Sequence, residues 1–179
     1  IKAVRPTFCP RNERASNWQV QMILTAQEEY GLRCALSLAR AGREESLTLS
    51  RIAVAEGLTT AYAGKLMRLL VQAGLVESTR GRSGGYVLTR DPASIKVSEV
   101  VGPLGGPFYD GEICTRPASA SALCVHNNDC AVRSLWSGMQ GMIDSYLAQV
   151  SLSDLVRDEA TMERTMEEIR ERTVVEGER

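Results

Sequence analysis

Residues 47–90 decide the fold, and they read LTLSRIAVAEGLTTAYAGKLMRLLVQAGLVESTRGRSGGYVLTR. Apolar spacing predicts a short helix over Leu49–Glu56 and a longer one over Thr60–Ala73, joined by a tight turn at Gly57. Thr59 is a good N-cap for the longer helix. Two helices joined by such a turn form a helix-turn-helix, whose second helix is the one expected to contact DNA.

A β-hairpin is predicted directly after these helices. Leu75–Thr79 and Tyr86–Thr89 are rich in strand-forming residues, and the Gly/Ser/Arg stretch between them favours a turn. A hairpin in this position is a wing, so the predicted fold class is mainly α, with a winged helix-turn-helix DNA-binding domain. Arg80 and Arg82 at the hairpin tip place two cations beside the second helix.

Helices are predicted on both sides of this unit. Residues 26–41 repeat apolar side chains at helical spacing, with Thr25 and Glu28 in a capping-box pattern. A short helix is expected from about Val97. From Cys130 to Gln149 an apolar stripe runs along a helix too apolar to lie exposed, and we expect it to pair with a copy of itself.

Composition and charge fit a nucleic-acid-binding protein. The 179 residues are 44% hydrophobic and 24% charged, with a net charge of −1. Residues 29–92 carry nine Lys/Arg against six Asp/Glu, whereas residues 144–179 carry five against ten. A basic body with an acidic end is compatible with DNA binding by the body. No apolar run approaches the ~18–20 residues that cross a bilayer, and no signal sequence is present, so the expected compartment is the cytoplasm.

Three of the five cysteines lie in residues 112–132, EICTRPASASALCVHNNDCAV, together with the single histidine, His126. They could be buried thiols, a disulfide with a leftover thiol, a zinc site or ligands of an iron–sulfur cluster. A reducing cytoplasm disfavours the disulfide. Cys124, His126 and Cys130 could supply three of the four zinc ligands, but the tight CxxC pair usual in zinc loops is absent.

Residues 22–156 resemble the iron–sulfur winged-helix repressor family of IscR-, NsrR- and RirA-type transcriptional regulators. The resemblance is carried by the first-helix start, the helix-turn-helix, the wing and the cysteine trio, in sequence MILTAQEEYGLRCALSLA, LTTAYAGKLMRLLVQAGLVES, RGRSGGYVLTR and the three cysteines before a long helix. The cysteines are spaced more widely here than is typical of the family. Gly64 stands in the second helix where a larger polar residue is usual, which leaves the target DNA sequence open.

The resemblance implies a homodimer that binds palindromic double-stranded promoter DNA and carries one [2Fe-2S] or [4Fe-4S] cluster per subunit. The implied thiolate ligands are Cys114, Cys124 and Cys130. Three thiolates leave a fourth place, for which an acidic residue of the other subunit's first helix serves in some family members; Glu29 falls on that position. His126 is the second candidate for this place.

The same resemblance and the helix-turn-helix pattern indicate the DNA-contacting residues. They are Thr59, Thr60, Tyr62, Lys65 and Arg68 on the second helix, with Arg80 and Arg82 on the wing. Hydroxyls and N–H groups at a helix start can hold phosphate, and the two cations three residues apart share one face. Arg80 looks like the family residue that enters the minor groove, while Tyr62 could equally pack inward.

The predicted organisation has five parts. They are an N-terminal extension (1–21), the winged helix-turn-helix domain (22–92), a connecting helix with the cysteine-bearing cluster-binding loop (93–130), a dimerisation helix with a short cap (131–156) and a charged tail expected to be frayed (157–179). Cys34 lies on the apolar face of the first helix and is expected to be a small residue of the protein core. Cys9 receives no role.

Two other functions compete with a cluster-controlled repressor. One is a cluster-free regulator of the same fold, switched by cysteine oxidation or by a protein partner. The other is a redox enzyme or electron carrier, but no nucleotide-binding fingerprint, catalytic His/Asp set or second cluster motif is present. We therefore expect no enzymatic activity, no small-molecule substrate and no membrane partner.

Overall fold

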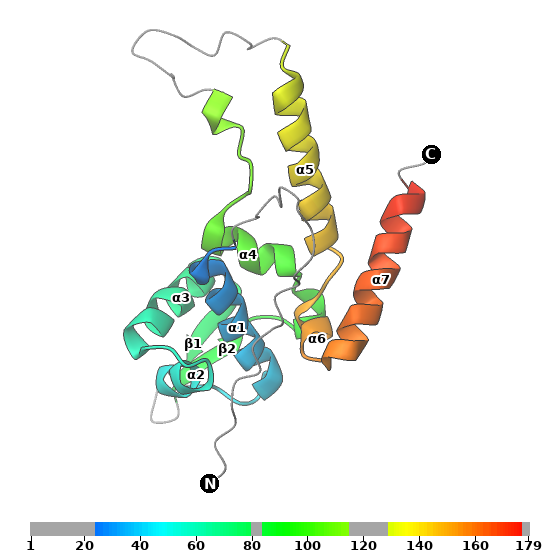
Figure 1. Ribbon diagram of the computed structural model, residues 1–179. Helices are drawn as coiled ribbons and strands as arrows, with labels where there is room; N and C mark the ends of the chain where they lie inside the picture. The colour runs from blue at the N-terminus through cyan, green and yellow to red at the C-terminus, as the bar shows by residue number, and fades with distance from the viewer. Residues whose placement is uncertain (1–23, 80–83, 115–128, 177–179) are drawn as a thin grey trace, which may run out of the picture.

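The computed structural model describes residues 24–79, 84–114 and 129–176, and these are mostly helical (Figure 1). The elements in chain order are α1 (Ala26–Ala41), α2 (Leu49–Ala55), α3 (Thr60–Gln72), β1 (Val76–Thr79), β2 (Gly85–Leu88), the short helix η1 (Pro92–Ser94), α4 (Val97–Gly105), the short helix η2 (Glu112–Cys114), α5 (Ala131–Leu147), α6 (Leu152–Leu155) and α7 (Glu159–Glu176). The predicted winged helix-turn-helix fold class is confirmed.

Local signals set the ends of α1. Thr25 and Glu28 form the predicted capping box, in which each side chain satisfies a backbone N–H group of the other residue. The helix stops at Gly42, whose backbone has φ 79°, a conformation that residues other than glycine rarely adopt. Thr48 and Thr59 cap α2 and α3 in the same manner, with each hydroxyl accepting from a backbone N–H three residues on.

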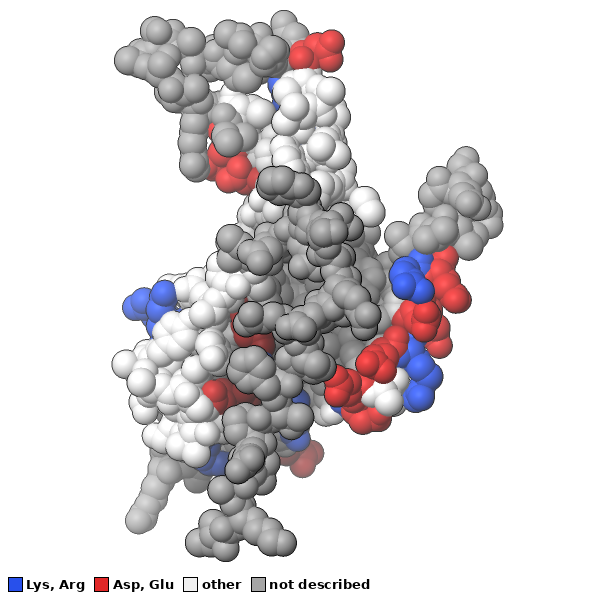
Figure 2. Space-filling view, in the orientation of Figure 1, with Lys and Arg blue, Asp and Glu red and all other residues white. Residues whose placement is uncertain are grey.

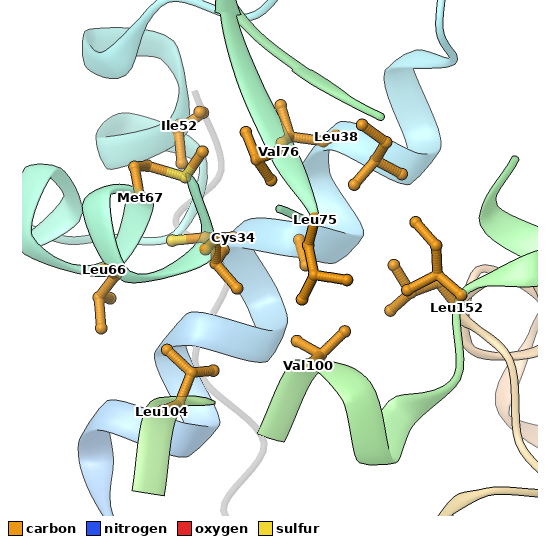
Figure 3. Close-up of a cluster of buried hydrophobic side chains, with 14 of the residues drawn as sticks. Cys34, Leu38, Ile52, Leu66, Met67, Leu75, Val76, Val100, Leu104 and Leu152 are labelled. Atoms are coloured by element: carbon orange, nitrogen blue, oxygen red, sulfur yellow. The ribbon is translucent and has the colours of Figure 1, made fainter. Parts of the chain in front are cut away.

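One apolar core holds the winged helix-turn-helix together (Figure 3). Ile52 of α2, Leu66 and Met67 of α3 and Cys34 of α1 are all fully buried. Val100 and Leu104 of α4 close the core from the other side of α1. The core fixes α3 with one face inward, so its opposite face is free to meet a partner.

The predicted wing is a two-stranded antiparallel hairpin. Val76 pairs with Leu88 and Thr79 with Gly85, and a bridge from Leu47 to Tyr86 ties the hairpin to the loop before α2. At Gly85 a Cβ atom would lie 2.6 Å from the Leu47 carbonyl oxygen, so only glycine fits this approach. The strands therefore hold the wing in a fixed position beside the helix-turn-helix.

The predicted long helix is α5, and it extends away from the winged body (Figure 1). None of its residues is buried within this chain, and Val132, Leu135 and Met142 are all more than half exposed. After α5, the Leu152 N–H donates to the Ile95 carbonyl at 2.9 Å, which returns the chain to the body at α6.

The expectation of a frayed tail is wrong for residues 159–176, which form the 18-residue helix α7. Met162, Met166 and Ile169 lie on one face of α7 because they are four and three residues apart. They pack on Val97, Val150 and the Tyr146–Leu147 end of α5 in a second apolar cluster, where Ile169 is 1% exposed. This burial orders a segment whose sequence is otherwise dominated by charge.

Candidate nucleic-acid interface and cysteine site

The outer face of α3 is exposed and basic. Thr59, Thr60, Lys65 and Arg68 are exposed, whereas Leu66 and its neighbours on the inner face are buried. Neither α2 nor α3 contains an acidic residue within its bounds. Figure 2 shows basic side chains over α3 and a row of mostly acidic side chains along α7. Basic residues on α3 and acidic residues on α7 thus lie on separate elements.

The start of α3 combines a cap with two hydroxyl groups. The Thr59 Oγ1 atom accepts from the Tyr62 N–H at 3.2 Å, and its own O–H group can still donate outward. The Thr60 hydroxyl lies one residue further on the exposed surface. Oriented hydroxyl and N–H groups at a helix N-terminus are suited to an anionic phosphate.

Tyr62 packs inward. Its ring meets the Tyr30 ring edge-to-face, with centroids 6.3 Å apart and planes at 80°, and it joins the rim of the main core. Such a pair stabilises the contact between α1 and α3. Of the two alternatives for Tyr62, the structure favours a packing role, although the half-buried phenol remains at the edge of the α3 face.

The first strand of the wing ends at Thr79 and the second begins at Gly85. Thr79 Oγ1 accepts from the Gly85 N–H at 3.0 Å and closes the hairpin where the strands end. The predicted wing cations, Arg80 and Arg82, lie outside the described residues. Their contacts with DNA remain a prediction.

Cys114 and Cys130 lie at the two ends of the segment that connects η2 to α5. Cys114 is the last residue of η2, and its Sγ atom lies 3.3 Å from the Tyr109 hydroxyl. Cys130 is the N-cap of α5, and its Sγ accepts from the Arg133 N–H at 3.4 Å. A helix N-terminus favours negative charge, so it suits a thiolate at this position.

Tyr109 contacts Cys114. Its hydrogen bond with Cys114 raises the pKa of the Tyr109 phenol, burial and the charge of Cys114 raise it further, and the charge of Arg133 lowers it. Sequence reasoning missed Tyr109, because a tyrosine in a Gly/Pro-rich linker has no periodic pattern that marks a function.

The residues present fit an iron–sulfur cluster by the chemistry of their donors. Cys114 and Cys130 are half-buried thiols, the first of them in contact with the Tyr109 phenol, and thiolates are the usual ligands of such clusters. Cys124 and His126 lie outside the described residues, and within the described part no three potential ligands come together. The cluster site thus remains a prediction from the sequence.

Glu29 lies in the first turn of α1 and pairs with Arg33, four residues on, at 2.6 Å. This pair raises the pKa of the Arg33 guanidinium through its hydrogen bond and the negative charge of Glu29. The Glu29 side chain is 38% exposed, so another chain can reach the carboxylate. Ligation by Glu29 from a partner subunit is consistent with this position and stays a prediction.

Cys34 has the predicted core position. It is fully buried, and burial raises the pKa of its thiol to about 12. A thiol with such a pKa is almost entirely protonated at neutral pH, and protonated thiols are poor ligands and poor nucleophiles. Cys34 therefore takes no part in the site formed by Cys114 and Cys130.

In the described part of the chain, no helix combines the length and the apolar character that a membrane span requires.

The sequence model of the Rrf2 family, described as an iron-dependent transcriptional regulator, matches residues 24–158. The chain is 29% identical over 142 residues to the HTH-type transcriptional regulator IscR of Xenorhabdus nematophila, covering 79% of this chain and 84% of that protein.

Two solved structures resemble this chain over most of its length. T. potens IscR is similar with a TM-score of 0.58 and 28% identity, covering 75% of this chain and 86% of the other. CymR, the global cysteine regulator of B. subtilis, is similar with a TM-score of 0.60 and 28% identity, and the match covers 76% of this chain and 97% of CymR. The family match ends just before α7 begins.

Proposed function

The chain belongs to the Rrf2 family of transcriptional regulators, and from that premise we propose that it is a homodimer whose affinity for palindromic DNA is set by an iron–sulfur cluster. Transcriptional regulation and DNA binding come with the family, and the family is not one of enzymes. The cluster, the dimer and the operator are the parts that we propose.

The observation that supports the cluster is the position of Cys114 and Cys130 at the two ends of the segment that contains Cys124, with the Cys114 sulfur in contact with the Tyr109 hydroxyl. A cluster bound by these thiolates would supply a redox-active and chemically labile group, whose loss or oxidation changes the charge and conformation of the loop. Cys130 is the N-cap of α5, so a change at this sulfur reaches the helix directly.

The DNA-binding surface is the exposed face of α3 together with the wing. Lys65 and Arg68, both exposed, would reach base edges or phosphates in the major groove, and Thr59 and Thr60 would contact phosphates. Arg80 and Arg82, which lie outside the described residues, would supply the wing's contacts, since a cation can enter a narrow minor groove. This proposal gives α3 the specific contacts and the wing the flanking ones.

The dimer would form along α5. Val132, Leu135, Met139 and Met142 make a stripe at heptad-like spacing, and three of them are more than half exposed in the single chain. The loop that carries Phe108 and Tyr109 packs on another face of the helix, roughly a third of a turn away, and leaves this stripe free. A second copy of α5 would bury it.

Two ligands compete for the fourth place on the cluster. Glu29 of the partner subunit is our first choice, because its carboxylate is accessible near the start of α1. His126 of the same chain is the second. Oxygen or nitrogen ligands hold iron less firmly than thiolates, and a weak ligand suits a sensor because it is lost first.

A cluster-free regulator is the alternative function, in which oxidation of the cysteines or a protein partner switches DNA binding. The structural similarity to CymR, a global cysteine regulator, favours keeping this alternative. Cys114 and Cys130 are both partly accessible and could serve as reactive thiols.

Anaerobic purification with iron and sulfide counted per chain distinguishes the two functions. Two of each, or four of each, with a brown absorption spectrum, is the expected result. Cys124→Ala should abolish the colour while the protein remains folded. Colourless wild-type protein after attempted reconstitution would exclude the cluster and leave thiol oxidation or a partner as the switch.

A further inference from the structure

We propose that Tyr109 is a hydrogen-bond donor to the Cys114 sulfur and that Gln140 anchors this tyrosine to α5. The inference rests on the proposed function for its main consequence, the retention of iron by Cys114. The contact itself exists with or without a cluster. Tyr109 is in this view a positioning residue for a ligand, not a ligand.

Two contacts fix the segment before Cys114 on α5. The Tyr109 N–H donates to the Gln140 Oε1 atom at 2.8 Å, and the Phe108 ring meets the Trp136 ring edge-to-face at 6.1 Å. Trp136 and Gln140 are four residues apart and so share one face of the helix. The loop is held by adjacent points of one helical face.

Gln140 is itself held in place. Its Nε2 atom donates to Asp144 Oδ1 at 2.7 Å, one turn further along α5. This bond fixes the amide so that its oxygen faces the Tyr109 N–H, because the amide nitrogen is already engaged. A line of polar contacts thus runs from Asp144 through Gln140 and Tyr109 to the Cys114 sulfur.

The direction of the hydrogen bond follows from chemistry once Cys114 binds iron. A coordinated thiolate has no proton, so the phenol must donate to it. The oxygen-to-sulfur distance of 3.3 Å is suited to an O–H···S bond. Such a donor withdraws charge from the sulfur and holds it in one orientation, and outer partners of this kind contribute to metal retention.

The test is the rate at which ferrozine removes iron from the anaerobically loaded protein. Tyr109→Phe removes only the hydroxyl, and we expect it to release iron about tenfold faster than wild type. Tyr146→Phe is the matched control, because the Tyr146 hydroxyl contacts the Met166 sulfur at 2.7 Å in the second apolar cluster. It should release iron at the wild-type rate.

Gln140→Leu provides a second variant of similar size that keeps the phenol and removes its anchor. We expect iron release to accelerate in the same direction, with circular dichroism confirming that α5 remains folded. Equal release rates for wild type, Tyr109→Phe and Gln140→Leu would overturn the proposal. Iron and sulfide counts on the same samples report separately on the cluster.

If the wild type holds no iron or sulfide, the proposed cluster fails, and the contact is then tested in the cluster-free protein. With tyrosine labelled by ¹³C at Cζ, the Tyr109 signal should shift in Cys114→Ala because the phenol loses its partner. The Tyr146 signal should stay in place and serves as an internal control. An unmoved Tyr109 signal would refute the hydrogen bond.

Discussion

Glu29 and Arg33 form an exposed ion pair on α1, and such a pair contributes little to stability. Pairs four residues apart on a helix surface are worth about 0.3–0.5 kcal/mol. Removing the Glu29 carboxylate should therefore change the stability of the fold very little, and a loss of the cluster in a Glu29 variant would not be a consequence of unfolding. This separation makes Glu29 well suited to a test of cluster ligation.

Glu29→Ala should lower the iron and sulfide content, or hasten their loss, while the melting temperature stays within a few degrees of wild type. The reason is that the fourth ligand is lost and the fold is not. Arg33→Gln is the matched control, since it removes the same ion pair but leaves the carboxylate. Undiminished cluster content in Glu29→Ala, with loss in His126→Ala, would transfer the ligand role to His126.

The site was predictable from sequence only where residue type and spacing carry a signal. Cys114 and Cys130 stand out as thiols, and the core position of Cys34 follows from the helical pattern around it. Tyr109 carries no such signal, because its role depends on a loop folding back onto α5. Tyr62 could not be assigned either, since an aromatic at the edge of a helix face can turn either way until Tyr30 is in place.

At the scale of elements, α3 and the wing should each contribute to DNA binding. Arg80→Ala is expected to weaken binding by ~1–3 kcal/mol if Arg80 makes a specific contact, and Lys65→Ala by a similar amount if it reads a base. Fluorescence anisotropy on a DNA duplex selected by the wild-type protein, at one fixed salt concentration, measures both.

Arg170→Ala is the control for these variants, because Arg170 lies on α7 paired with Glu167 and away from α3. Its affinity should match wild type. If Lys65→Ala and Arg80→Ala also bind with wild-type affinity, the surface formed by α3 and the wing is not where DNA binds.

α7 should contribute to the stability of the whole chain through its buried face. Ile169→Ala removes a fully buried side chain from the second apolar cluster, and such truncations cost about 2–5 kcal/mol. Arg172→Ala, on the exposed face of the same helix, should cost about 0.5 kcal/mol at most. Urea unfolding followed by circular dichroism tests this, and equal midpoints for the two variants would mean that α7 does not pack as described.

The elements themselves were largely predictable, with bounds that differ from the structure by a residue or two. Caps at Thr25, Thr48 and Thr59 and the turn glycines carry local signals that the tertiary structure does not override. The formation of α7 as a helix was not predictable in the same way. The three apolar residues that α7 packs in the second cluster are fewer than its charged residues, and they specify a helix only because α4, α5 and α6 supply a surface for them.

At the scale of the whole molecule, the proposed regulator is a dimer of two chains paired along α5. Leu135→Glu places a charge in the free stripe of α5 and should convert the dimer to a monomer, because burying an unpaired carboxylate opposes association. Val54→Glu is a matched control on another exposed apolar residue, since Val54 is 83% exposed on α2. Light scattering coupled to size-exclusion chromatography measures the mass, and an unchanged dimer in Leu135→Glu would place the interface elsewhere.

The charges of the molecule fit this arrangement. The basic face of α3 belongs to the winged body, whereas α7 carries an acidic surplus on a separate side (Figure 2). Pairing along α5 would present two winged bodies to one duplex, which is the arrangement that a palindromic site requires. The long helix would then couple the cysteine loop to the spacing of the two α3 helices.

The most direct measurement is the affinity of one selected duplex for the same protein with its cluster and after anaerobic removal of the cluster, at matched salt. The account predicts a difference of about tenfold or more, equivalent to roughly 1.4 kcal/mol, and no such difference between equally treated samples of Cys124→Ala. Equal affinities for the loaded and cluster-free wild type would contradict the claim that an iron–sulfur cluster controls this regulator.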